Sequence, residues 1–338
     1  MLTKVSLQNF TVFSDASIAF APGVNVFIGS NGTGKTQLLK GIYGCCESTR
    51  EKDCRPFFEC FRTQNSADLM RDSSLQSFGF TIECNQTNQI RNLSMETYTF
   101  GLTRDAKGKN AATQVAKISV PAAEIDAAYI PVKDMLTHAH GLLAMARKYQ
   151  DFPFDKTLMD SIEKAERWIV KEPTNLVGNL FDKLVDCMGG RVVYENDEFY
   201  ILKQDGQKIR FELEAEGFKK LGVLWQFLMN ETILPGTVLL WDEPESNLNP
   251  EFLPLVAECL LALAAMGVQV FISTHSYILA KYIEIKMKKQ PVLFHSFYIQ
   301  DGLVHCESAS LFSNLQHNSI MAAFETLMDE IYKGQGGE

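Results

Sequence analysis

Continuous apolar runs predict buried strands along the chain, and the segments beside them carry apolar residues at helical spacing. The runs lie at residues 24–28, 237–241 and 268–273, and unbroken apolar strands are typical of parallel sheets that are covered on both faces. A helical segment follows the first run at 36–43, and another precedes the third run at 252–266. This succession of buried strands and helices predicts an α/β fold.

A second pattern predicts antiparallel strands. Polar and apolar residues alternate at 78–86, and further strand-like stretches lie at 95–103 and 115–120. Alternation of this kind is typical of strands with one buried face. Together with residues 1–28, these stretches predict an antiparallel β-layer.

The remaining segments predict two hairpins and two helical regions. The hairpins span 192–210 and 292–306, and each has turn-forming Asn, Asp or Gly residues between its strand-like halves. Helical spacing extends over 134–187 and over 319–333. No heptad repeat is sustained, so a long coiled coil is excluded.

Residues 29–36 carry the strongest chemical signal. They read GSNGTGKT and fit the P-loop pattern G-x-x-x-x-G-K-[ST]. A glycine-rich loop can turn its backbone N–H groups towards a polyphosphate, and the start of the next helix also favours an anion. In this pattern the lysine faces the β- and γ-phosphates of ATP, and the threonine hydroxyl binds Mg²⁺. The predicted phosphate-binding residues are Ser30, Asn31, Gly32, Thr33, Gly34, Lys35 and Thr36.

Two adjacent carboxylates, Asp242 and Glu243, follow the second apolar run. This is a Walker B pattern, in which a buried strand delivers an aspartate to the Mg²⁺ beside the P-loop. We therefore expect Asp242 to bind the metal together with Thr36. Glu243 is the expected general base that orients and deprotonates the attacking water. A solvated strand end is the alternative interpretation, and the P-loop upstream favours the nucleotide site.

The residues after Glu243 indicate which class of P-loop protein the chain resembles. A Ser-Asn-rich loop at 246–249 leads into a helix, with Asn249 as its predicted N-cap. The third apolar run then ends near His275. This order resembles the ABC-type ATPases, in which a P-loop, a Walker B motif, a D-loop and a switch histidine follow one another. In that family the histidine contacts the γ-phosphate, so the resemblance implies a catalytic role for His275.

A signature motif precedes Walker B in ABC-type ATPases. Residues 214–221, EAEGFKKL, resemble the degenerate form found outside transporters, where a short Ser-x-Gly core faces the γ-phosphate held by the partner subunit. The resemblance implies that Gly217 contacts the nucleotide of a second chain. Ala215 stands where the family has serine, so one hydroxyl contact is missing. The start of an ordinary amphipathic helix is the alternative interpretation.

The chain as a whole resembles the ABC-type AAA ATPases related to the overcoming-lysogenization-defect (OLD) nucleases and to SMC-like repair ATPases. ATPase subunits of anti-phage systems such as Septu and PARIS belong to this group. The opening segment 2–13 is similar to the usual first strand of these proteins, and Tyr129-Ile130-Pro131 is similar to one of their strand-end motifs. The resemblance implies a P-loop NTPase fold of the ABC type, which has a mixed or parallel sheet core, an antiparallel β-layer and a helical arm.

The motif positions predict three parts. Residues 1–133 form an N-terminal lobe with the P-loop and the β-layer, and residues 134–190 form an inserted helical arm or lid. Residues 191–338 form a C-terminal lobe with the signature-like motif, Walker B, the D-loop and the switch histidine.

Composition agrees with an ATPase that lies in the cytoplasm. The chain has 338 residues, 46% of them hydrophobic, and no signal peptide is visible. The apolar stretch at 252–273 is interrupted by Glu258 and Gln269, which favours a buried helix and strand over a membrane span. The cysteine spacing is poor for a zinc site. The net charge of −9 does not favour direct attraction to nucleic acid, and the basic run 286–289 is expected to be solvated.

Three functions fit these features. The first is a homodimeric or larger ATPase that uses ATP and Mg²⁺ to control a separate effector, such as a nuclease or toxin in anti-phage defence. In this case any contact with nucleic acid is expected through the complex, and no membrane contact is expected. The second is a DNA repair or recombination ATPase that clamps DNA as a dimer. The third, a transporter ATPase subunit, is weakest because the Leu-Ser-Gly-Gly-Gln signature is absent.

Overall fold

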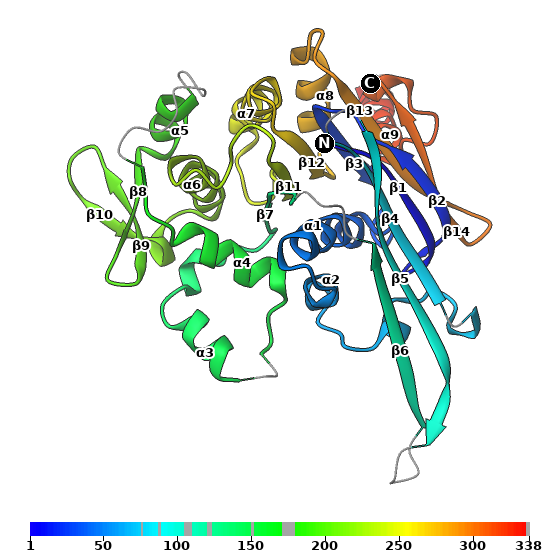
Figure 1. The fold of residues 1–338 in the computed structure, drawn as a ribbon. Coiled ribbons are helices and arrows are strands. Elements are labelled where there is room, and N and C mark those ends of the chain that lie inside the picture. Colours follow the sequence, from blue (N-terminus) through cyan, green and yellow to red (C-terminus); the bar gives the residue numbers. More distant parts are fainter. Residues whose placement is uncertain are drawn as a thin grey trace.

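A computed structural model gives the structure of the protein (Figure 1). It describes residues 1–75, 77–86, 89–104, 110–119, 124–149, 152–170 and 180–335.

A six-stranded sheet forms the centre, in the order β14-β13-β3-β12-β11-β7. Neighbouring strands from β13 to β7 run parallel, and β14 runs antiparallel at one edge. Strands β3, β7, β11 and β12 are buried at every position, because other elements cover both faces of the sheet. The predicted α/β fold with a mixed, mostly parallel sheet is therefore confirmed. The strands are Val24–Gly29 (β3), Ala127–Ile130 (β7), Val238–Asp242 (β11), Gln269–Ser273 (β12), Val292–Gln300 (β13) and Leu303–Ala309 (β14).

The predicted antiparallel β-layer is a five-stranded sheet in the order β2-β1-β4-β5-β6. Residues 24–28 are the buried strand that the apolar run predicts, and only their assignment to this layer as part of residues 1–28 was wrong. They form β3, which pairs with β12 and β13 of the central sheet. Residue 120, the last of the predicted strand at 115–120, lies outside the described residues. The strands of the layer are Leu2–Phe10 (β1), Phe13–Ala19 (β2), Ser77–Gln86 (β4), Gln89–Arg104 (β5) and Asn110–Ser119 (β6).

Helix α1 (Lys35–Glu51) lies between the two sheets (Figure 1). Its buried Leu39 belongs to one apolar cluster with Phe80 of β4 and Leu240 of β11. Cys46 also lies in this cluster, where its thiol packs as a small apolar group. Helix α1 is longer than the predicted 36–43, because apolar contacts on both sides also stabilise its C-terminal half. The short helix α2 (Arg55–Glu59) packs against α1.

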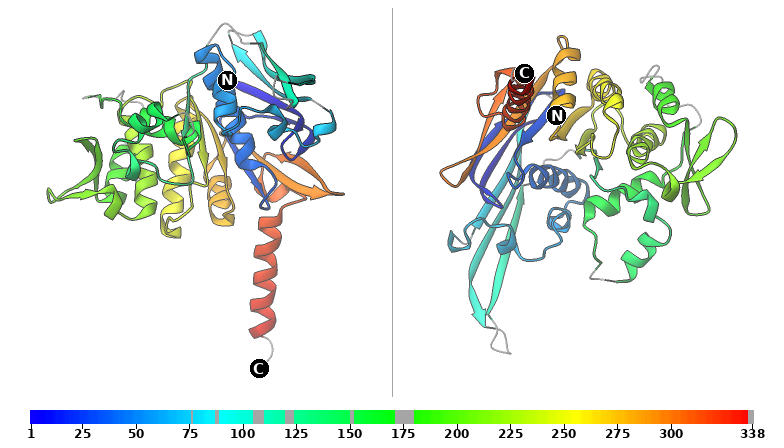
Figure 2. Two further views of the ribbon diagram at one scale, coloured as in Figure 1. Left: turned by 90° about the horizontal axis from the view of Figure 1, so that it is seen from below. Right: turned by 180° about the vertical axis from the view of Figure 1, so that it is seen from behind.

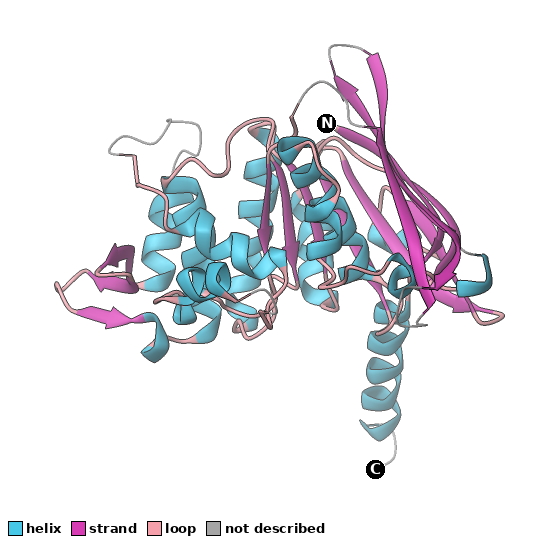
Figure 3. Ribbon diagram, turned by 60° about the horizontal axis from the view of Figure 1, so that its bottom comes forward, coloured by secondary structure: helices cyan, strands magenta, loops and turns pink. Residues whose placement is uncertain are grey.

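Helices cover the other face of the central sheet, as Figure 3 shows. They are α6 (Glu216–Met229), α7 (Leu253–Ala265) and α8 (Tyr277–Lys286), and they share a second apolar cluster with the sheet. The predicted hairpin at 292–306 is present as β13 and β14. The predicted hairpin at 192–210 is present as part of a three-stranded sheet in the order β10-β9-β8, built from Gly190–Glu195 (β8), Glu198–Lys203 (β9) and Lys208–Arg210 (β10).

The predicted arm contains α3 (Leu142–Lys148), α4 (Lys156–Ala165) and α5 (Leu180–Met188). Its residues 150–151 and 171–179 lie outside the described part of the chain. The boundaries of the three predicted parts stay a prediction.

A buried polar network ties α4 to α1. The ammonium group of Lys164 donates to Glu47 Oε1 at 2.6 Å and to the Tyr43 hydroxyl at 2.9 Å. The same hydroxyl donates to Asp160 Oδ2 at 2.7 Å. Near the first turns of α1, Lys40 pairs with Asp155 at 2.7 Å. Burial makes the loss of one partner in such a network costly, so α4 is held firmly on the P-loop helix.

The C-terminal helix α9 (Ser319–Gln335) has a different environment. It packs at its start and then projects away from the body, most clearly in the left view of Figure 2. In the part of the chain that the structure describes, no helix is both long enough and apolar enough to cross a membrane.

Candidate functional site

The P-loop connects the carboxyl end of β3 to the first turn of α1. Gly29 has φ +141°, and a Cβ atom there would lie 2.2 Å from the carbonyl oxygen of Phe297 on β13. Gly34 has φ +89°, and its Cβ would lie 2.6 Å from Val12. Close neighbours and positive φ values therefore require glycine at both positions. Gly32 also has positive φ, but no atom lies within 4 Å of the position of its Cβ, so the loop is open there.

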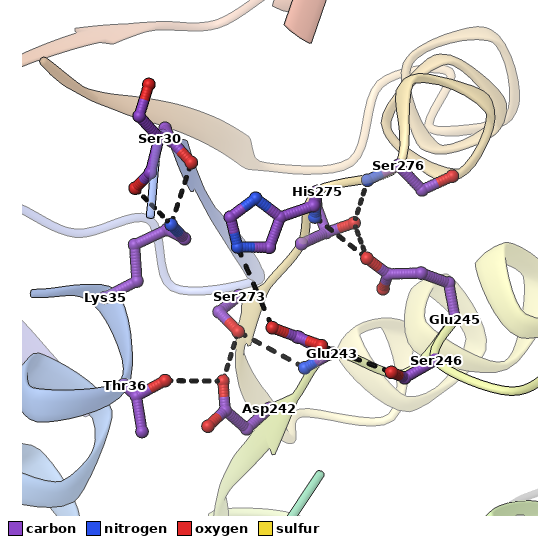
Figure 4. A network of polar contacts seen from close by, with 12 residues as sticks. Ser30, Lys35, Thr36, Asp242, Glu243, Glu245, Ser246, Ser273, His275 and Ser276 are labelled. Atoms are coloured by element: carbon purple, nitrogen blue, oxygen red, sulfur yellow. Dashed lines mark hydrogen bonds and ion pairs between the residues drawn. The ribbon is translucent and has the colours of Figure 1, made fainter. Parts of the chain in front are cut away.

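Lys35 lies on the inner side of this loop. Its ammonium group donates to the carbonyl oxygens of Gly29 at 2.8 Å and Ser30 at 3.0 Å (Figure 4). The Thr33 hydroxyl donates to the Ser30 carbonyl as well, at 2.8 Å. Burial lowers the pKa of Lys35 to about 8, against the opposing effect of nearby carboxylates. The loop thus presents a positive charge at the start of a helix, where phosphate is favoured.

Asp242 lies next to Thr36, although the two residues are 206 positions apart in the sequence. The Thr36 hydroxyl donates to Asp242 Oδ1 at 3.2 Å, and the Ser273 hydroxyl donates to the same oxygen (Figure 4). The Tyr129 hydroxyl reaches Oδ2 at 3.4 Å. Asp242 is buried, and burial raises the pKa of its carboxyl group. A hydroxyl and a carboxylate at this spacing form an oxygen donor set that suits Mg²⁺.

Glu243 and His275 face each other at the same edge of the sheet. His275 Nε2 lies 3.7 Å from Glu243 Oε1, and the Ser246 hydroxyl donates to Glu243 Oε2 at 3.2 Å (Figure 4). The backbone of Glu243 has φ 48°, a left-handed conformation that is rare for a non-glycine residue and is often found at functional sites. Burial, followed by the charge of Lys35, lowers the pKa of His275. The structure brings the predicted base and the predicted switch histidine together.

Sequence reasoning missed Glu245. Its Oε1 accepts the Thr274 hydroxyl at 2.7 Å and the backbone N–H of His275 at 2.8 Å. Burial raises the pKa of this carboxyl group. Glu245 therefore positions the loop that carries His275, and the third carboxylate within four residues was the signal for it. Tyr129, which binds Asp242, lies in the strand-end motif noted in the sequence, but its contact with Asp242 was not predicted, and Ser273 carried no signal.

The signature-like segment lies behind the Walker B loop of its own chain. Gly217 is buried, and a Cβ atom there would lie 2.8 Å from the Asn247 carbonyl oxygen. Lys220 donates to the Glu243 carbonyl at 2.8 Å, and burial lowers its pKa to about 8. Lys219 pairs with Glu216 at 2.6 Å. These contacts lie within one chain, so the contact of Gly217 with the nucleotide of a second chain stays a prediction.

Family models cover most of the chain. The model described as "AAA domain, putative AbiEii toxin, Type IV TA system" matches residues 59–280, about two thirds of the chain. The model described as "AAA ATPase domain" matches residues 1–85, which include the P-loop.

The chain belongs to the AAA ATPases.

Curated relatives match this AAA ATPase over short segments. The DNA replication and repair protein RecF of Streptococcus thermophilus is 45% identical over 42 residues, which is 12% of each chain. RecF of Ligilactobacillus salivarius is 50% identical over 82 residues, or 24% of this chain and 21% of RecF. The chain thus spans only a small part of the length of these relatives.

Solved structures share the fold. An SmcHead bound to the C-winged helix domain of ScpA superposes with a TM-score of 0.57 and 15% identity, over 92% of this chain and 98% of the SmcHead. The Smc head domain of Pyrococcus yayanosii gives a TM-score of 0.55 at 11% identity, over 97% of this chain and 99% of that chain. At these identities the likeness establishes the fold alone. With the family match, it identifies an ATPase of the AAA type with an SMC-head-like fold.

Proposed function

We propose that this ATPase binds ATP with Mg²⁺ at the P-loop edge and hydrolyses it there. Residues 30–36 hold the phosphates, and Lys35 exchanges its loop carbonyl partners for the β- and γ-phosphates. Thr36 and Asp242 supply oxygen ligands for Mg²⁺, which neutralises phosphate charge when bound. Glu243 accepts the proton of the attacking water, and His275 contacts the γ-phosphate.

We infer that hydrolysis requires a second copy of the chain. His275 and residues 30–32 are exposed in the single chain, so water has free access to the position of the γ-phosphate. A second copy on this edge would exclude that water and strengthen the electrostatic contacts inside the site. In the ABC-type ATPases that the chain resembles, a head-to-tail dimer fulfils this role, with the signature of each chain, here Gly217, facing the P-loop of the other.

We propose that this cycle of dimerisation controls a separate effector, a nuclease or a toxin, in anti-phage defence. The observation that supports it best is the family match over residues 59–280, whose description names a putative toxin of a toxin–antitoxin system. The described helices of the arm are short, the longest being α4 with 10 residues. A long clamp around DNA therefore has less support than the control of a partner protein.

Expression in a bacterial host tests the proposal. The chain is produced with the product of the neighbouring gene, and phage plating is measured for the parent and for Glu243→Gln. Protection by the parent pair and its loss in the variant, at equal protein levels, are expected. Equal plating with and without the parent pair would contradict a defence role. Co-purification of the two proteins, in the presence and absence of ATP, tests the contact with the effector directly.

The RecF matches support a second candidate, an ATPase that clamps DNA during repair. The ATPase rate with and without double-stranded DNA distinguishes the two proposals. Stimulation by DNA in the absence of any partner protein favours the repair function. A rate that responds only to the neighbouring gene product favours effector control.

A further inference from the structure

The two carboxylate oxygens of Asp242 have different neighbours. Oδ1 accepts the hydroxyl of Thr36 at 3.2 Å and also the hydroxyl of Ser273 (Figure 4). Oδ2 accepts the hydroxyl of Tyr129 at 3.4 Å. An ionised carboxylate can only accept hydrogen bonds, so all three hydroxyl groups donate to it. Hydrogen bonds on both oxygens therefore fix the orientation of the Asp242 side chain.

The central sheet brings Tyr129 to this carboxylate. Tyr129 of β7 lies opposite Leu240 of β11 in the parallel register, and both residues belong to the apolar cluster around α1. Residues two positions apart on a strand point to the same face of a sheet. Asp242 follows Leu240 by two positions, so its carboxylate lies on the same face as the Tyr129 ring. The phenol hydroxyl reaches Oδ2 diagonally across the two strands.

The contacts around Tyr129 hold its ring in place. The side chain is 1% exposed and packs edge-on against Tyr43, with ring centroids 5.5 Å apart and planes at 65°. The Tyr43 hydroxyl donates to Asp160 on α4. Lys164 of α4 donates to that hydroxyl and, at 2.6 Å, to the backbone carbonyl of Ala127 in β7. The buried network of α4 thus supports both the ring beside Tyr129 and the strand that carries it.

The contact with Tyr129 limits how Asp242 can bind a metal ion. Oδ1 lies beside the hydroxyl of Thr36, the second predicted ligand, whereas Oδ2 is already bonded to Tyr129. An ion held by Thr36 and Asp242 therefore receives one carboxylate oxygen. Mg²⁺ demands near-ideal octahedral geometry, whereas the larger Ca²⁺ takes more oxygens and accepts both from one carboxylate. A carboxylate with one oxygen engaged suits Mg²⁺ better than Ca²⁺.

We propose that Tyr129 is a positioning residue that selects Mg²⁺ over Ca²⁺ at the nucleotide site. Its hydroxyl holds Oδ2 of Asp242 and keeps Oδ1 turned towards Thr36. A hydrogen-bonded neighbour commonly orients a metal ligand in this way. Without the hydroxyl, the carboxylate can rotate and offer both oxygens, which favours Ca²⁺. This role rests on the proposed metal site of Thr36 and Asp242.

Calorimetric titration with ATP tests the role, with Glu243→Gln as the parent so that ATP persists. The affinity is measured with magnesium chloride, with calcium chloride and with EDTA, and the gain from each ion is its ratio to the EDTA value. Tyr129→Phe keeps the ring but lacks the hydroxyl. It is expected to lower the Mg²⁺ gain about tenfold, as is typical when a neighbour of a metal ligand is lost. The Ca²⁺ gain should stay equal or rise, and the affinity in EDTA should not change.

Tyr43→Phe is the matched control. It removes a hydroxyl from the adjacent buried ring, but this hydroxyl bonds Asp160 and Lys164 and not Asp242. Thermal unfolding without nucleotide should show a lower stability than that of the parent, because buried polar groups lose a partner. The gains from Mg²⁺ and Ca²⁺ should match those of the parent. Equal changes of the Mg²⁺ gain in the two Tyr→Phe variants would assign the effect to packing and overturn the proposal.

Three further results would overturn the selection of Mg²⁺ by Tyr129. They are an unchanged Mg²⁺ gain in Tyr129→Phe, an equal loss of the gains from both ions, and an equal loss of affinity in EDTA. Failure of the proposed metal site gives a different result, because it does not involve Tyr129. An Mg²⁺ gain that persists undiminished in Asp242→Asn, or a parent without any such gain, would overturn that site. A parent that fails to bind ATP would overturn the nucleotide site as a whole.

Discussion

Two helix starts flank Glu243, and both carry a glycine followed by a buried lysine whose pKa is lowered to about 8. In the loop that leads into α1, a Cβ atom at Gly32 would meet no atom within 4 Å, and Lys35 contacts only carbonyls of the loop among the hydrogen bonds of the described chain. At the start of α6, Gly217 is packed against the Asn247 backbone, and Lys220 donates to the Glu243 carbonyl.

This contrast shows that an anion site requires open space as well as positive charge. Both helices offer free backbone N–H groups and a positive side chain, which favour an anion. The loop before α1 is also open at Gly32, whereas Gly217 at the start of α6 is closed in by the chain itself. We infer that α1 binds the phosphates within its own chain. Within that chain Gly217 and Lys220 of α6 support the Walker B loop, and Gly217 meets nucleotide only across the proposed dimer. Four predictions test whether the two helix starts have these different roles.

The largest effect is expected for Glu243→Gln. The amide keeps the shape of the side chain but cannot accept a proton, so single-turnover hydrolysis should slow by about 10²–10⁴-fold. ATP affinity should be retained, because Asp242 and not Glu243 is the predicted metal ligand. Rapid-quench hydrolysis and calorimetric binding provide the two measurements. Hydrolysis at the parental rate would assign water activation to another residue.

Lys35→Ala is expected to weaken ATP binding on the order of 10²-fold, because a charged contact to the phosphates is lost. Lys40→Ala is the matched control. This substitution removes the same charge from the same helix, but the ammonium group of Lys40 binds Asp155, the N-cap of α4, and does not face the loop. Isothermal titration with ATP and Mg²⁺ measures both variants. Equal affinities of the two variants would contradict phosphate binding by the P-loop lysine.

Gly217→Ala is expected to destabilise the fold by about 1–3 kcal/mol, since the added methyl group meets the Asn247 carbonyl and Leu248. Thermal unfolding in the absence of nucleotide measures this directly. Gly32→Ala is the comparison, because no atom lies near its Cβ position and only the positive φ opposes the change. Full stability of Gly217→Ala together with a lost dimer would instead favour contact of Gly217 with a second chain.

The smallest effect is expected for the contribution of Lys220 to the pH dependence of stability. The pKa of Lys220 is about 8 in the fold, below its ordinary value of 10.5, so the unfolded chain binds more protons between these pH values. Stability from this group therefore rises as the pH increases from 8 to 10.5, by at most about 1.4 kcal/mol per unit. Lys220→Met should lack this contribution, while its ATP affinity stays near that of the parent. Denaturant unfolding at pH 8 and pH 10 compares the two proteins. Identical pH dependence would show that Lys220 titrates normally.

Local sequence determined much of the fold. The apolar runs at 24–28, 237–241 and 268–273 became buried parallel strands, and the alternating stretches became the antiparallel layer. Both results follow from side-chain periodicity, which depends only on neighbouring residues. The P-loop pattern also fixed the ATPase class, because glycine spacing and the following lysine are local properties of the chain.

Tertiary structure decided which distant residues meet. Thr36 lies next to Asp242 only because β3 and β11 flank β12 in one parallel sheet. The strand order also brings Tyr129 to Asp242, while the D-loop closes over Gly217. Strand order results from long-range hydrogen bonds and from burial on both faces of the sheet, which no local spacing encodes. For the same reason the helical spacing at 319–333 predicted α9, but only the packed structure determined that Leu327 and Ile331 on it stay exposed among the described residues.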